Sequence, residues 1–199
     1  MRIAWRTVLV VCAAFSAVFP ALADEGLDKA RAMMVAMHGE RCAQNPPPDE
    51  DWADRAWPLQ WRDAFQAADE PDRRARLMRL YCDSGAYNVL HAWFVETDEG
   101  VSPLAFAAPA FDVSRATDEF DSAVTGIKVT GMLSELMLVN SNYDPASGMI
   151  AMASMWRGIG DAFSTGEWRM VEGAPVLKTY EVDASYDGEQ TPRAIYKAE

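Results

Sequence analysis

Beyond residue 71 the chain alternates short apolar runs with connectors rich in glycine, aspartate and proline. The runs recur at intervals of roughly ten residues, a spacing typical of strands joined by tight turns. Glycine and aspartate supply the positive backbone angles that hairpin turns require. The pattern predicts an antiparallel β-meander over residues 71–199. Strands are expected at 77–82, 87–96, 101–106, 127–130, 133–139, 149–156, 167–171 and 176–182, and the acidic stretch 107–125 is expected to be a long loop.

The preceding segment, residues 24–70, has a helical pattern instead. Apolar side chains recur at steps of three or four residues over 26–41, which predicts an amphipathic helix that ends before the prolines at 46–48. A second helix is expected over 51–68, where large aromatic residues recur at four-residue steps. These aromatic residues are Trp57, Trp61 and Phe65, and we expect them at the seam between this segment and the sheet. An exposed platform for a glycan or a peptide is the alternative. The predicted fold class is α+β, mainly β.

Residues 1–23 have the three parts of a secretory signal peptide. Arg2 and Arg6 precede an apolar run, which is followed by Ala21-Leu22-Ala23. The run is shorter than the roughly 20 apolar residues that a membrane-spanning helix needs. No later stretch is long and apolar enough either, so we expect no transmembrane segment after cleavage. The sequence therefore predicts a soluble periplasmic protein.

Export affects the interpretation of the cysteines. Cys12 belongs to the predicted signal peptide, which leaves Cys42 and Cys82 in the mature chain. Two thiols in an oxidising compartment usually form a disulfide. The expected bridge would close a loop of about 40 residues, worth roughly 4 kcal/mol in the chain-entropy model. Two free thiols and a metal-binding pair are the open alternatives.

The balance of charge limits the class of partner. The chain has 30 acidic and 18 basic residues, with a formal net charge of -12. Nucleic acids and anionic membrane surfaces are bound by clustered lysine and arginine, so we expect neither as a partner. An envelope protein or a glycan is expected instead. An acidic surface favours a cationic partner through electrostatic steering.

Four short motifs follow one another along the chain, at residues 82–88, 143–148, 157–161 and 167–169. They resemble the C-x-x-G-A-Y-N, D-P-x-T-G, R-G-x-G-D and W-x-W segments of an exported bacterial family catalogued as domain of unknown function 1176. The resemblance covers residues 75–182 and corresponds to the C-terminal half of that family. It implies an envelope location and a β-rich fold, and it transfers no catalytic residue. The family normally has a cysteine after R-G-x-G-D, where this chain has Ala162, so one family disulfide is missing.

The loops at 83–88 and 157–166 are the candidate binding surface. The segment 84–87 is similar to the S-G-x-x-Y loop of bacterial lysozyme inhibitors, although it is one residue shorter. Because the motifs occupy neighbouring turns, we expect Tyr87, Asn88 and Arg157 to lie close together. The sequence thus favours a binding or inhibitor-like module. The candidate binding residues are Ser84, Gly85, Tyr87, Asn88, Arg157 and Asp161.

Catalytic signatures are missing from the sequence. It contains neither G-x-S-x-G nor H-E-x-x-H nor a Walker loop, and its two histidines are His38 and His91. We therefore do not favour an enzyme. The alternative is a periplasmic hydrolase that uses a carboxylate pair in a cleft between the helical segment and the sheet.

One segment resembles half of a calcium-binding loop. Asp183, Ser185 and Asp187 occupy the first three ligand positions, and Gly188 stands where the loop needs a sharp turn. The last ligand position is Ala194 instead of glutamate. A plain hairpin turn is favoured, with calcium binding at these three residues as the alternative. No other cofactor is expected.

Overall fold

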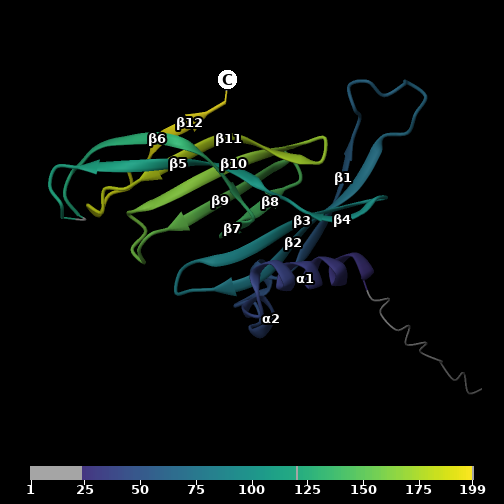
Figure 1. The fold of residues 1–199 in the computed structure, drawn as a ribbon, viewed down its shortest axis with the longest axis horizontal. Coiled ribbons are helices and arrows are strands. Elements are labelled where there is room, and N and C mark those ends of the chain that lie inside the picture. Colours follow the sequence, from purple (N-terminus) through teal and green to yellow (C-terminus); the bar gives the residue numbers. More distant parts are fainter. Residues whose placement is uncertain (1–23, 120, 199) are drawn as a thin grey trace, which may run out of the picture.

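The structure is a computed structural model that describes residues 24–119 and 121–198 (Figure 1). The predicted signal peptide lies outside the described residues. The helices are α1 (Glu25–His38), α2 (Arg41–Gln44) and the 3-10 turn η1 (Glu50–Trp52). The strands are β1 (Arg55–Trp61), β2 (Arg73–Ser84), β3 (Val89–Thr97), β4 (Gly100–Pro103), β5 (Phe106–Arg115), β6 (Val124–Glu135), β7 (Met137–Val139), β8 (Asn142–Asp144), β9 (Met149–Met155), β10 (Phe163–Val171), β11 (Ala174–Asp183) and β12 (Arg193–Lys197).

These strands form three antiparallel sheets in the described part of the chain. The first sheet has the order β1-β2-β3-β4, and β7 also pairs with β3. The second has the order β12-β11-β10-β9-β8, and β5 pairs with β6 as a two-stranded ribbon. Neighbours in the sheets are mostly neighbours in sequence, so the predicted α+β class with an antiparallel meander is confirmed.

Strand β2 lies between two apolar clusters formed by the described residues. Met78 and Leu80 on one face pack with Ala30 and Met34 of α1. Leu77 on the other face joins a larger cluster that continues into the second sheet. The layers are therefore α1, the first sheet, and then the second sheet together with the β5–β6 ribbon. Figure 1 shows α1 lying along the first sheet.

The predicted disulfide between Cys42 and Cys82 is confirmed. It joins residues 40 positions apart and connects α2 to β2. Both cysteines are buried within the cluster on the α1 side of the sheet. The N-terminal helices are thus attached to the sheet both by apolar packing and by a covalent bond.

The prediction of a helix over 51–68 is wrong, because this segment contains η1, strand β1 and an extended loop. A four-residue step also fits a strand, in which every second side chain points to the same face. Trp57 stacks on Trp93 with ring centroids 5.8 Å apart, which places it at the expected seam. Pro58 is tolerated because β1 is at the edge of its sheet. Phe65 lies beyond the strand and is fully exposed, so its expected place at the seam is wrong.

The prediction of a long loop over 107–125 is also wrong. Most of it belongs to β5 and β6, which pair along nearly their whole length. Alanine-rich sequence has a low strand propensity, so the run at 107–110 gave no strand signal. The short strands β8 and β12 were not expected either. In the described part of the chain, no helix combines the length and the hydrophobicity that crossing a bilayer requires.

Candidate functional site

Two asparagines join the β2–β3 turn to the second sheet. The Asn88 side chain donates to the carbonyl of Met155 at 2.8 Å and accepts from the Met155 amide at 3.1 Å, so it pairs with that residue as a strand would. Asn140 donates to the carbonyl of Ala153 at 2.9 Å and accepts from the amide of Val89 at 2.7 Å. Its φ of 44° lies in the left-handed region, where asparagine is enriched. These contacts fix the two sheets relative to each other.

The turn between β9 and β10 is closed by an ion pair. Arg157 Nε donates to Asp161 at 2.6 Å, and its Nη2 donates both to Asp161 and, at 2.9 Å, to the carbonyl of Tyr186. Asp161 also accepts from the amide of Gly188 at 2.8 Å. The Arg157 guanidinium lowers the pKa of Asp161 to about 2, so the carboxylate stays ionised at neutral pH. The β9–β10 turn and the loop around residue 186 are therefore held together.

Tyr87 and Ile159 are the exposed apolar residues at this junction. Tyr87 is 41% exposed and Ile159 is 72% exposed. A Cβ built on Gly158 would lie 3.5 Å from the Tyr87 ring, so the ring packs against the glycine backbone. The Tyr87 hydroxyl also donates to the carbonyl of Trp156. We call Tyr87, Gly158 and Ile159 the tip surface.

The expected proximity of Tyr87, Asn88 and Arg157 is confirmed, because the first two residues contact the backbone at 155 and 156. Ser84 and Gly85 lie in the same turn, where Gly85 donates its amide to Asn88 at 2.8 Å. Ser84 hydrogen-bonds the hydroxyl of Tyr81 at 3.1 Å. The predicted residues other than Tyr87 thus mainly hold the turns in place.

Sequence reasoning missed Ile159. It is a bulky β-branched residue in a turn that otherwise consists of glycine and a charged pair. A β-branched side chain in such a turn has no local packing role, and that signal alone could have identified it.

Two loops with exposed acidic side chains lie near the β9–β10 turn. Gln190 donates to the carbonyl of Gly160 at 2.8 Å, which brings the loop at 186–190 against the β9–β10 turn. The pKa of Arg157 is raised mainly by its hydrogen bond to Asp161 and, more weakly, by Asp121, so the β5–β6 turn is also nearby. We call the exposed acids of these two loops the acidic rim. They are Asp118, Glu119, Asp121, Asp187 and Glu189.

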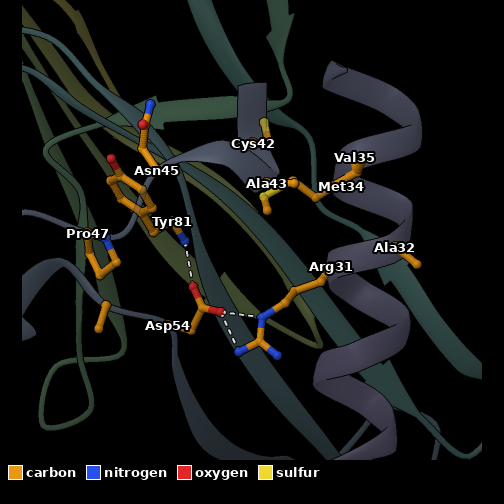
Figure 2. A pocket seen from close by; sticks show the side chains of 11 residues that line it. Arg31, Ala32, Met34, Val35, Cys42, Ala43, Asn45, Pro47, Asp54 and Tyr81 are labelled. Carbon is orange, nitrogen blue, oxygen red and sulfur yellow. Dashed lines mark hydrogen bonds and ion pairs between the residues drawn. The ribbon is translucent and has the colours of Figure 1, made fainter. Parts of the chain in front are cut away.

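A groove of about 770 Å³ lies beside α1 (Figure 2). Much of its lining is apolar and comes from Met34, Val35, Cys42, Ala43 and Pro47. At its polar end Asp54 accepts from Arg31 Nε at 2.8 Å and from the Tyr81 amide at 2.8 Å. Figure 2 shows both contacts meeting at the one carboxylate. This cleft between the helical segment and the sheet is where a catalytic carboxylate pair was expected, and Asp54 is the one acidic residue in its lining.

His91 belongs to a buried polar network on the opposite face of the first sheet. Its Nε2 lies 3.1 Å from the carbonyl of Trp52, and its Nδ1 lies 3.4 Å from Ser141 Oγ. Ser141 also accepts from the indole of Trp93 at 3.0 Å. Burial lowers the pKa of His91 to about 4, so the ring is neutral at physiological pH. Because His91 and Ser141 are fully buried, this serine–histidine contact is structural.

Arg79 completes the buried network. Its guanidinium donates to the carbonyls of Ser141 at 2.8 Å, Asp51 at 2.6 Å and Ala53 at 3.1 Å. Burial lowers its pKa to about 10, which still leaves it charged at neutral pH. A single side chain thus holds the segment around residue 52 and the start of β8 against β2.

The half calcium loop uses its oxygens within the loop itself. Asp183 accepts from the Ser185 amide at 3.0 Å, from the Ser185 hydroxyl at 2.7 Å and from the Thr191 amide at 2.5 Å. Asp187 accepts from the amide of Glu189 at 2.9 Å. These residues form the connection between β11 and β12. In the described residues, no group of three or more histidine, cysteine, aspartate or glutamate side chains is placed to hold a metal.

Together, the fold and this junction define an antiparallel β protein with a disulfide-linked N-terminal helical segment. The family described as "Protein of unknown function (DUF1176)" matches residues 20–188, and the chain belongs to that family. The match extends well beyond the C-terminal half that the motifs indicated, since it includes α1 and both bridged cysteines. No curated protein and no solved structure matches the chain.

Proposed function

We propose that this protein is an exported binding module that holds a cationic protein in the periplasm through its tip surface and acidic rim. The signal-like segment at residues 1–23 supports export. The disulfide supports an oxidising compartment, because such bonds are rare in the cytosol.

The observation that carries the proposal is the exposure of Tyr87 and Ile159 on an immobilised base. Binding energy in protein interfaces is concentrated in a few side chains, among which tyrosine is enriched. A contact surface that is already rigid loses less conformational entropy on binding. The asparagine and arginine contacts beneath the tip surface supply this rigidity.

Charge selects the class of partner. The rim contributes five exposed acids, whereas the nearby Arg157 is paired with Asp161. Arg115 is likewise engaged, because it donates to the carbonyls of Ser122 and Ala184. A negative rim around an apolar centre accelerates encounter with a positively charged partner and disfavours acidic ones.

A strongly cationic lysozyme is the probe that tests the proposal. We expect calorimetric binding that weakens as salt is added, and inhibition of muramidase activity at equivalent protein concentration. Ile159→Asp should weaken binding by tenfold or more, on the order of 1.4 kcal/mol. The control is Val171→Asp, since Val171 is also an exposed β-branched residue but lies at the other end of β10.

Two results would contradict the proposal. Lysozyme that fails to bind even at low salt would exclude this partner class. If the Ile159→Asp and Val171→Asp variants bind lysozyme equally strongly, the contact lies away from the tip surface.

The second candidate function is a hydrolase, and a different part of the molecule supports it. Glu167 and Glu181 line one hollow of about 520 Å³ on the outer face of the second sheet. The register pairs Glu167 with Thr179 and Glu181 with Thr165, so the two acids are diagonal neighbours. The backbone positions of diagonal neighbours lie roughly 7–8 Å apart. The carboxyl groups of inverting glycosidases are separated by roughly 6.5–9.5 Å. The test is whether the wild-type protein releases reducing sugar from peptidoglycan. Activity that is present in the wild type and lost in Glu167→Gln would support the hydrolase over the binding module.

A further inference from the structure

Strand β6 is uncovered on both faces along half of its length. Residues 128–134 are seven consecutive exposed positions, whereas a strand with one covered face alternates exposed and buried side chains. In the described part of the chain β6 pairs with β5 alone, so no strand is hydrogen-bonded to its other edge. The start of β6 is different, because Val124 and Ile127 pack against the main apolar cluster.

The uncovered part of β6 is apolar. Met132 is 51% exposed and Leu133 is 53% exposed, and Val129 and Leu136 are also among the exposed large apolar residues. Exposed strand edges usually carry charges or proline, which prevent pairing with another chain. Over 129–134 the sequence has neither. This edge therefore lacks the usual protection against strand addition.

We propose that this edge pairs with β6 of a second copy of the chain, which forms an antiparallel dimer. This inference goes beyond the binding function proposed above and rests on different residues. Open strand edges add a further strand through backbone hydrogen bonds, while alternate side chains give specificity. A second copy is the occupant because a twofold axis makes one apolar edge complementary to itself.

Charge supports a second copy over other partners. The chain carries a formal net charge of -12, so most of its surface repels another copy. Residues 128–136 contain one lysine, Lys128, and one acid, Glu135, and are neutral overall. Two copies can therefore approach along this strand without bringing acids together.

The expected centre of the dimer follows from the register. The pairing with β5 is irregular between Val129 and Gly131, because β6 carries an extra residue there. The regular part of the edge therefore runs from residue 131 to residue 135. Antiparallel pairing of residues 131–135 with the same residues of the other copy places Leu133 of both copies at the twofold axis, with Met132 of each copy opposite Ser134 of the other.

Sedimentation equilibrium over a wide range of protein concentration tests the proposal. The wild-type chain should change from monomer to dimer as concentration rises, and Leu133→Lys should stay monomeric, with at least a tenfold weaker association constant. Val176→Lys is the matched control, because Val176 is another exposed aliphatic residue, on β11, and its substitution should leave the dimer intact. Thermal unfolding of each variant confirms that it is folded.

Hydrogen exchange gives an independent measurement on the unmodified protein. Amides at 131–135 should exchange more slowly as concentration rises, while those of the tip surface should not change. A wild-type chain that stays monomeric at the highest concentration overturns the proposal. A dimer that Leu133→Lys leaves unchanged also overturns it, since the contact would then lie elsewhere.

Discussion

Strands β2 and β6 have the same length of 12 residues and opposite environments. From Leu77 to Cys82 every residue of β2 is buried, although that strand contains four arginines. The second half of β6 is exposed although its residues are mainly apolar or small. Position decides this difference, because β2 lies inside its sheet with α1 on one face, whereas β6 is the outer strand of a ribbon.

The charges of β2 are tolerated because each inward-facing arginine has fixed acceptors. Arg79 donates to backbone carbonyls in two separate segments. Arg76 pairs with Asp24 at the start of α1 and with Glu96 on β3. Hydrogen bonds and ion pairs of this kind replace the hydration that a charge loses on burial. We therefore expect large effects from substitutions in β2 and small ones in β6.

The largest effect is expected at Arg79. Arg79→Met would leave one buried and two partly buried carbonyls without their donor, so the free energy of unfolding should fall by about 3–5 kcal/mol. Urea denaturation measures this loss. Arg74→Met is the control in the same strand, because Arg74 is exposed and its loss should change stability by about 0.5 kcal/mol or less. A loss at Arg79 as small as that of the control would contradict the role given to the network.

Loss of the disulfide at the end of β2 should have the second-largest effect on stability. Replacing both Cys42 and Cys82 with alanine removes a cross-link between residues 40 positions apart. The denatured chain then gains conformational freedom, and stability should fall by roughly 4 kcal/mol or somewhat less. Urea denaturation of the wild-type chain with and without reductant provides the comparison. If reduction leaves the midpoint unchanged, the bond does not stabilise the attachment of the helices.

His91, opposite Tyr81 of β2, should make stability depend on pH. Its folded pKa is about 4 because it is buried, whereas an unfolded histidine titrates near 6.5. The unfolded chain therefore binds a proton first, and stability should fall as the pH drops from 6.5 towards 4, by roughly 3 kcal/mol. Urea midpoints for the wild type and His91→Gln measure this. The His91→Gln variant should lack this loss of stability at low pH. Identical pH profiles for the two proteins would show that His91 does not cause the pH dependence.

The smallest effects on stability are expected at the exposed apolar positions. Leu133→Lys and Ile159→Asp alter side chains that are more than half exposed, so each should change the free energy of unfolding by about 0.5 kcal/mol or less. Their effects should appear in association and in partner binding instead. A loss of several kcal/mol in either variant would mean that the residue packs against the core and is not a contact surface.

Much of the fold could be predicted from the sequence, because turn residues separate most of the strands after residue 71. The helix α1 and the disulfide also followed from local spacing and compartment. Strand β1 could not be separated from a helix, because aromatic residues four positions apart share a face in both. The β5–β6 ribbon was missed because its pairing comes from tertiary contacts and not from strand propensity.

The candidate site was predictable only in its location. The turns at 84–88 and 157–161 were identified from their motifs, and their proximity was expected. The sequence could not show that Asn88 and Arg157 are occupied by structural contacts while Ile159 is exposed. It also gave no indication of Asn140, whose role depends on three segments that meet only in the folded chain. Burial and partner geometry are long-range properties that local patterns do not contain.

Hydrogen exchange of the wild-type chain with and without lysozyme tests the proposed function most directly. The account predicts that amides at 84–88 and 156–161 exchange more slowly when lysozyme is bound, while those at 171–176, at the other end of the sheet, are unchanged. Slowing confined to other parts of the chain, or none at saturating lysozyme, would contradict it.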